Sequence, residues 1–134
     1  VDSAQPDDWR VRVGTVRLNQ NVIATNFNAY VDSGTTTLAI PEQLYAMIQN
    51  QIPAQTSSCS LLPNLTFTIN NINYTLGPKQ YSFYQGNWCH PNIFPWSGNS
   101  WILGSPFLQS VYTSFNIETN QLGFAPVRSQ FLPS

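Results

Sequence analysis

Apolar and polar residues alternate along several short stretches of the chain, and a period of two is typical of a half-buried β-strand. Residues 9–16 alternate Trp and Val with Arg, and residues 65–69 and 72–76 alternate in the same way. The Asn-Asn pair at 70–71 suits a tight hairpin turn between the last two stretches. The pattern therefore predicts a strand at 9–16 and a hairpin at 65–76.

The remaining pattern predicts further strands and two short helices. A second hairpin turn is expected at 19–21, with its returning arm leading into residues 30–32. One helix is expected to begin at Pro41 and to end before Pro53, because proline suits a first helical turn and disfavours helix before it. The other predicted elements are strands at 38–40, 101–103, 111–115 and 121–125, a helix at 106–110, an aromatic loop region at 77–100, an extended arm at 1–8 and a tail at 127–134.

Composition limits the possible functions. The 134 residues suit one domain, 1–134, and the 42% apolar and 13% aromatic residues suffice for a core. Only 8% of residues are charged and the net charge is −1, which argues against nucleic-acid binding and against disorder. No apolar run approaches the length of a membrane span, so no membrane partner is expected. The single histidine, His90, has no companions at metal-ligand spacing, and we expect neither metal nor cofactor.

Asp32 is the most informative residue of the chain. It follows the apolar run 29–31, where a buried strand is expected, and few acidic residues occur elsewhere. A buried carboxylate is costly unless it accepts hydrogen bonds. Donors follow at once in Ser33, Gly34, Thr35 and Thr36. The segment therefore predicts a strand that ends in a tight turn, with one carboxylate held by several donors.

Two motifs together resemble a known family. Asp-Ser-Gly-Thr-Thr at 32–36 resembles the active-site loop of the pepsin-like aspartic peptidases, in the form usual for their C-terminal lobe. Alone it is a weak signal. Residues 101–126 strengthen it, because Ile-Leu-Gly, a short helix, a hairpin and a Gly-Phe-Ala strand follow in the family's order. The resemblance extends from Trp9 to Pro126. It implies a mainly β fold, the single C-terminal lobe of a bilobal enzyme, with two short helices.

The resemblance also implies roles for individual residues. Asp32 corresponds to a catalytic carboxylate, held by the Gly34 N–H and the Thr35 hydroxyl. Ser33 would bond across the interface between lobes, and Thr36 would contact the substrate backbone. Tyr30 and Ile102 are expected as walls of a substrate pocket. The alternative for the hydroxyl residues is a turn that only satisfies its own backbone. Gly104 is expected where the backbone passes close beside the Asp32 turn.

Peptide hydrolysis of this kind needs two carboxylates, which share one proton because two like charges so close cannot both ionise. The chain offers one suitable acid, since the others are expected to be solvent-exposed: Asp2, Asp7, Asp8, Glu42 and Glu118. The expected partner is therefore the N-terminal lobe of the same protease, on a separate chain or in a missing segment, with a peptide or protein as substrate. Two alternatives are an inactive binding protein with this fold and a homodimer that pairs two Asp32 residues.

Cysteines and sequons indicate the compartment. By the resemblance, Cys59 and Cys89 form a disulfide, although the residues alone would also allow two buried thiols. Asn64 and Asn73 each begin an Asn-X-Thr sequon and are candidate glycosylation sites in a secretory chain. A secreted or vacuolar location is therefore expected.

Overall fold

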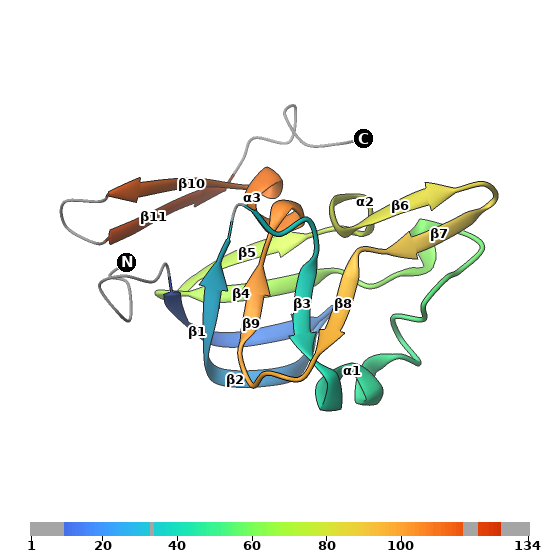
Figure 1. Cartoon of the computed structure of the whole chain (residues 1–134), viewed down its shortest axis with the longest axis horizontal. Helices are drawn as coiled ribbons and strands as arrows, with labels where there is room; N and C mark the ends of the chain where they lie inside the picture. Colours follow the sequence, from blue (N-terminus) through green and yellow to red (C-terminus); the bar gives the residue numbers. More distant parts are fainter. Residues whose placement is uncertain (1–9, 33, 117–120, 127–134) are drawn as a thin grey trace.

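The computed structural model describes residues 10–32, 34–116 and 121–126. A seven-stranded sheet runs through the molecule in the order β5-β4-β1-β2-β9-β3-β8 (Figure 1). Its strands are β1 (Arg10–Leu18), β2 (Asn21–Val31), β3 (Leu38–Pro41), β4 (Leu65–Ile69), β5 (Ile72–Leu76), β8 (Ile93–Trp96) and β9 (Trp101–Leu103). The β2–β9 and β3–β8 pairs are parallel, and the other pairs are antiparallel. The mainly β fold predicted from the sequence is confirmed.

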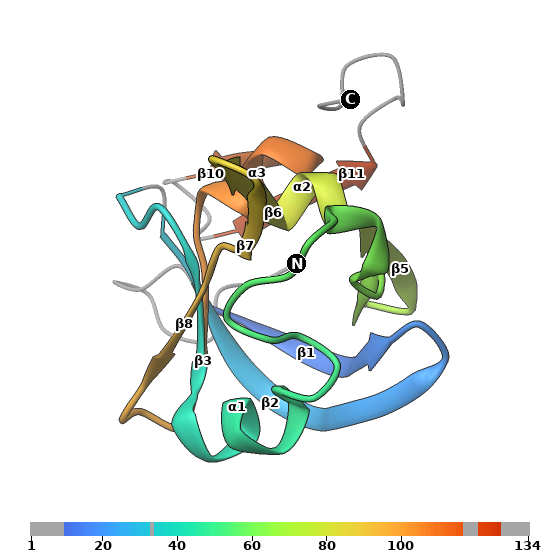
Figure 2. The same ribbon diagram turned by 90° about the vertical axis from the view of Figure 1, so that its right-hand side faces the viewer.

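Short helices and two hairpins surround this sheet. The helix α1 (Glu42–Ile48) lies at one end of the sheet, whereas α2 (Pro78–Tyr81) and α3 (Ser105–Ser110) lie at the other (Figures 1 and 2). The additional elements are the 3₁₀ turn η1 (Cys59–Leu61) and the hairpins β6 (Ser82–Gln85) with β7 (Trp88–Pro91) and β10 (Val111–Asn116) with β11 (Gln121–Pro126). The predictions for Trp9, the arm 1–8, the turn 118–120 and the tail lie outside the described residues.

The prediction of a loop region at 77–100 is wrong. It contains α2, β6, β7 and β8, which gives three short α-helices in the described chain where the sequence predicted two. The sequence pattern misses these strands because tertiary contacts determine them. Leu38 pairs with Ile93, so β8 is a strand because it adds to the edge of β3. The β6–β7 hairpin turns at Gly86, whose φ of +64° is one that glycine adopts without strain.

Two other predictions concern the hairpin turn at 70–71 and the end of the first helix. The hairpin turn at 70–71 is confirmed, and both asparagines have the positive φ that the favoured two-residue turns require. The first helix, however, ends at Ile48 and not at Ile52. The N–H groups of Gln51 and Ile52 both donate to the Ile48 carbonyl at 2.9 Å, which closes a turn at the end of the helix. Ile52 is buried in the core all the same.

Aromatic rings connect the layers of the core. Phe67 of β4 meets Trp101 and Phe107 edge-on, with ring centroids 5.6 Å apart in both pairs. Phe107 of α3 in turn contacts Phe124 of β11 at 5.8 Å. Edge-to-face pairs contribute about 0.5–1.5 kcal/mol each beyond the burial of their surface. This chain of rings fixes α3 and the β10–β11 hairpin against the sheet.

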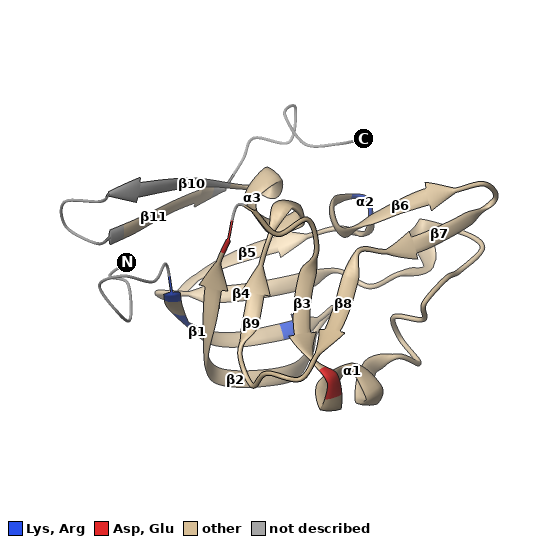
Figure 3. Ribbon diagram, viewed as in Figure 1, with Lys and Arg blue, Asp and Glu red and all other residues tan. Residues whose placement is uncertain are grey.

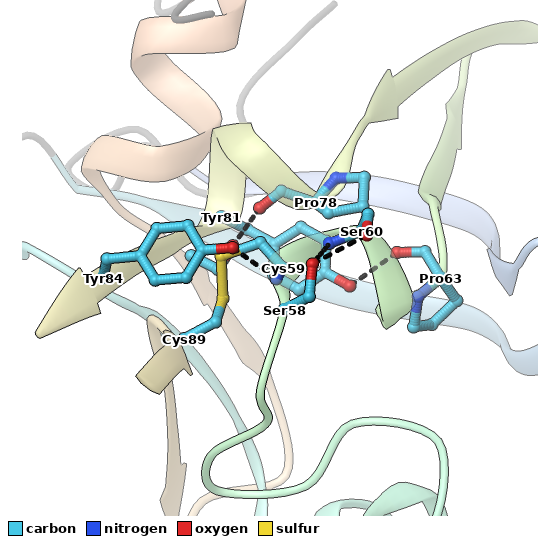
Figure 4. Close-up of a disulfide and its surroundings, with 9 residues drawn as sticks. Ser58, Cys59, Ser60, Pro63, Pro78, Tyr81, Tyr84 and Cys89 are labelled. Carbon is cyan, nitrogen blue, oxygen red and sulfur yellow. Dashed lines mark hydrogen bonds between the residues drawn. A yellow bond between two sulfur atoms is a disulfide. The ribbon is translucent and has the colours of Figure 1, made fainter. Parts of the chain in front are cut away.

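The predicted disulfide is present and joins η1 to β7. Cys59 and Cys89 are bonded over a sequence separation of 30 residues, and the Cys59 N–H donates to the Tyr84 hydroxyl at 3.1 Å (Figure 4). Nearby, the buried Tyr81 hydroxyl donates to the Pro63 carbonyl at 2.5 Å, and burial raises the pKa of Tyr81 far above its usual value. Closing a loop of this length stabilises a fold by about 3–4 kcal/mol on a chain-entropy estimate.

His90 lies in a strand, and the helices of the described chain are short. His90 is half-buried and follows the disulfide residue Cys89 in β7, and its ring stacks on Phe83 at 5.6 Å. Among the described residues, none of the helices combines the length and the apolarity that a membrane crossing requires.

Candidate active site

Asp32 lies where β2 leaves the sheet. Tyr30 and Val31 pair in parallel with Ile102 and Leu103 of β9, and the Asp32 N–H donates to the Leu103 carbonyl at 3.2 Å. The strand assignment ends at Val31, and Asp32 is exposed. The expectation of a buried carboxylate is therefore wrong for this chain, because the buried positions of β2 stop one residue earlier.

Both oxygens of the Asp32 carboxylate accept a hydrogen bond from the turn that follows. The Gly34 N–H donates to Oδ1 at 2.9 Å, and the Thr35 hydroxyl donates to Oδ2 at 2.8 Å. The Thr35 N–H also donates to the Asp32 carbonyl at 3.2 Å. Hydrogen bonds to an ionised acceptor are stronger than neutral ones. The predicted donors Gly34 and Thr35 are thus in place, whereas Ser33 lies outside the described residues.

A second segment of backbone holds this turn from behind. The Ser105 N–H donates to the Thr35 carbonyl at 2.9 Å, and its hydroxyl reaches the same oxygen at 3.3 Å. A Cβ on Gly104 would lie 2.3 Å from the Thr37 carbonyl oxygen and 2.4 Å from that of Thr35. Only glycine fits there. The predicted close passage of Gly104 is confirmed, and it fixes the turn against the junction of β9 and α3.

Asn92 makes a contact with the Asp32 turn that the sequence did not indicate. Its side-chain amide donates to the Thr36 carbonyl at 2.8 Å, and its own carbonyl accepts from the Leu38 N–H at 3.0 Å. It therefore ties the start of β8 to both ends of the segment that leads from the turn to β3. Asn92 is 56 residues from Thr36 in the chain, and an isolated Asn in a loop-like stretch carries no signal for this contact.

Tyr30 and Ile102 lie on one side of the sheet. Tyr30 and Ile102 are paired neighbours and half-buried, while the residues flanking them along both strands are buried in the core. Successive side chains of a strand point to opposite faces, so Tyr30 and Ile102 share the face opposite to their buried neighbours. The guanidinium of Arg10 lies 5.3 Å from the centre of the Tyr30 ring. Tyr30 and Ile102 thus lie side by side on the two strands that lead to the Asp32 turn and to Gly104.

Acidic side chains are sparse in the described part of the chain. The only two there are Asp32 and Glu42, and Glu42 is exposed in the first turn of α1, at the opposite end of the sheet (Figure 3). Asp2, Asp7, Asp8 and Glu118 lie outside the described residues. Within the described ranges, no three side chains of His, Cys, Asp or Glu come together as metal ligands would. No second described carboxylate accompanies Asp32.

A polar cavity adjoins the turn. Its volume is about 450 Å³, and its lining includes Thr36, Phe83, Asn92 and Ser105. A larger cavity of about 640 Å³, lined by Asn19, Leu62 and Asn64 among others, includes no residue of the Asp32 turn. Of these two cavities, the smaller one lies beside the Asp32 turn, because Thr36 of that turn lines it.

Comparison with known proteins agrees with this geometry. The family model described as eukaryotic aspartyl protease matches residues 1–127. The chain belongs to the eukaryotic aspartyl proteases. It is 36% identical to pepsin A of Rhinolophus ferrumequinum and 34% identical to cathepsin E of Aquarana catesbeiana, each over 136 aligned positions that cover 89% of this chain. Pepsin A of Canis lupus familiaris is also 36% identical over the same share.

The match covers this aspartyl protease chain far better than it covers its relatives. The aligned region is 35% of the bat pepsin A and 34% of the frog cathepsin E. The chain therefore spans about a third of the length of the curated relatives that it matches.

Proposed function

We propose that this chain is the C-terminal lobe of a pepsin-like aspartic endopeptidase and supplies Asp32 as one of the two catalytic carboxylates. The observation that carries the proposal is the Asp32 turn, in which Gly34 and Thr35 hold both carboxylate oxygens at the end of β2. This geometry occurs in a member of the aspartyl proteases, at the Asp-Ser-Gly-Thr sequence that resembles their active-site loop.

The chemistry follows from two carboxylates that share a proton. One carboxylate takes a proton from a water molecule as that water attacks the peptide carbonyl, and the other protonates the carbonyl oxygen. Asp32 is exposed, and no carboxylate lies beside it among the described residues, so the proposal takes the second acid from outside them. The N-terminal lobe of the same protease, on a separate chain or in a missing segment, supplies it in this proposal.

The residues around Asp32 have matching roles. Tyr30 and Ile102 form apolar walls for a substrate side chain, and Thr36 at the rim of the 450 Å³ cavity contacts the substrate backbone. Ser33 bonds across the interface between the lobes. The substrate is a peptide or an unfolded protein chain. The Cys59–Cys89 disulfide supports a secretory or vacuolar compartment, because disulfides persist in oxidising compartments.

The test compares this chain alone with the same chain joined to the N-terminal lobe of its own protein. Both forms are assayed on an unfolded protein in mild acid, with and without a pepstatin-type inhibitor, and their masses are measured in solution. We expect inhibitor-sensitive hydrolysis by the joined form and none by the monomeric chain. Activity of the chain alone as a dimer would replace the proposal with pairing of two Asp32 residues. An inactive joined form that still binds peptides would replace it with a binding protein.

A further inference from the structure

The seven-stranded sheet has two edges, and only one of them carries an ordinary protection against pairing with other chains. Unpaired strand edges promote association, and proteins block them with proline, charge or bulges. The β8 edge contains Pro95, which lacks an N–H. The β5 edge reads Ile-Asn-Tyr-Thr-Leu, without proline or charge, and Ile72 is 47% exposed. Among the described residues, no strand pairs with the outer side of β5.

Asn73 stands in the middle of this unprotected edge. It is exposed and lies opposite Thr68 of β4. Its Oδ1 accepts from Arg17 at 3.1 Å and from the Thr68 hydroxyl at 2.6 Å. Arginine only donates hydrogen bonds, so the atom that faces it must be the amide oxygen. The amide nitrogen is the other polar atom of this side chain, and it has no hydrogen-bond partner among the described residues.

We propose that Asn73 carries an N-linked glycan whose sugars cover the free edge of β5. Asn73-Tyr74-Thr75 is a sequon, and its asparagine is exposed with an amide nitrogen that no described residue binds. In the modification, an oligosaccharide on a lipid diphosphate carrier is the donor. A bond forms between Nδ2 and the first sugar carbon, the bond from that carbon to phosphate oxygen breaks, the lipid diphosphate leaves with the electron pair, and Nδ2 loses one proton.

The two hydrogen bonds to Asn73 Oδ1 are compatible with this modification. Glycosylation leaves Oδ1 an acceptor, so the bonds from Arg17 and Thr68 persist and orient the first sugar. A glycan on β5 adds a large polar group to a strand that has no charge of its own. The proposal rests on the secretory compartment of the proposed function, because the transferase acts there.

Asn64 provides a matched comparison. Its backbone N–H donates to Asn19 Oδ1 at 3.0 Å, and its carbonyl accepts from the Asn19 N–H at 2.8 Å. It lines the 640 Å³ cavity and precedes β4, an interior strand of the sheet. A glycan there would not cover the β5 edge. Loss of the Asn64 sequon should therefore leave the association of the protein unchanged.

The experiment uses the full chain joined to its N-terminal lobe and secreted from a eukaryotic host. Peptide mapping by mass spectrometry locates the glycan, and light scattering follows self-association. The variants are Thr75→Val, which removes the sequon but keeps Asn73; Thr75→Ser, which keeps both; and Asn64→Gln. We expect the parent, Thr75→Ser and Asn64→Gln to carry a glycan at Asn73 and stay monomeric. Thr75→Val should lack it and associate several-fold faster.

A second experiment separates the effect of losing the glycan from the effect of the amino-acid substitution. Trimming the folded parent with an endoglycosidase that leaves one sugar keeps the sequence intact, and it should produce the same faster association. An unmodified Asn73 in the secreted parent would overturn the proposal. So would a trimmed parent that associates no faster than the untrimmed one. Peptide hydrolysis by the joined parent is measured in the same samples, so failure of the proposed function is seen separately.

Discussion

Two regions of the molecule rely on side-chain hydrogen bonds: the Asp32 turn and a polar surface that we call the threonine face. The threonine face spans β1, β4 and β5 and consists of Arg17, Thr66, Thr68, Asn73 and Thr75. In the turn, backbone from β9 and α3 comes so close that a single added carbon would collide with two carbonyl oxygens. On the threonine face, the hydroxyl pair Thr66–Thr75 is 2.9 Å apart at an exposed position, where water can replace either partner. The first arrangement fixes a geometry, and the second mainly keeps one surface polar.

The largest expected effect tests the role of the turn. Asp32→Asn in the assembled two-lobe enzyme should lower turnover by at least the roughly 10²–10⁴-fold that a positioned acid–base group contributes. Asparagine is nearly isosteric, so thermal unfolding should change little. Turnover and unfolding temperature are measured side by side. Glu42→Gln, at an exposed position in α1, is the matched control and should keep parental turnover. If Glu42→Gln lost turnover while Asp32→Asn kept it, the assignment of Asp32 as a catalytic carboxylate would be contradicted.

The next effect tests the close backbone passage. Gly104→Ala should destabilise the chain by about 3 kcal/mol, the upper end of the usual cost of overpacking, because the colliding atoms are backbone oxygens that cannot rotate away. Denaturant unfolding measures the change. Gly14→Ala is the control, since its Cβ would lie at an ordinary 3.5 Å from the Thr68 carbonyl oxygen. Equal stability of the two variants would show that the passage is looser than described.

A smaller effect is expected from a single donor in the turn. Thr35→Val keeps the shape of the side chain but removes the hydroxyl that donates to Asp32 Oδ2 at 2.8 Å. A hydrogen bond to a charged group contributes about 1.5–3 kcal/mol when shielded, and the exposure of Asp32 places this one at the lower end. Turnover should fall about tenfold, which corresponds to roughly 1.4 kcal/mol. Unchanged steady-state turnover would mean that Gly34 alone orients the carboxylate.

The smallest effect is expected on the threonine face. Thr66→Val removes the same kind of hydroxyl as Thr35→Val, but from an exposed pair. In chain produced without glycans, it should change the free energy of unfolding by less than about 0.5 kcal/mol, as exposed substitutions usually do. Denaturant unfolding of Thr66→Val and Thr35→Val under the same conditions compares the stability that each hydroxyl contributes. A larger loss for Thr66→Val would show that the threonine face is more than a polar surface.

Local patterns in the sequence were enough for most strands and for the hydrogen bonds within the Asp32 turn. Alternation located β1, β4 and β5, and the Asn-Asn pair located a turn whose positive φ values the structure confirms. Asp32, Gly34 and Thr35 are within four residues of each other, so their hydrogen bonds follow from chain geometry alone. These predictions succeeded because the deciding interactions are between near neighbours.

Tertiary structure decided what depends on distant partners. Region 77–100 became strands only because β8 adds to β3 and a disulfide holds β7, and neither contact leaves a periodic pattern in so short a stretch. The contact of Asn92 with Thr36 joins residues 56 apart. The exposure of Asp32 also depends on where the sheet ends. A sequence pattern records which residues prefer burial, but the edge of a sheet is set by which strands meet, and that is a property of the folded chain.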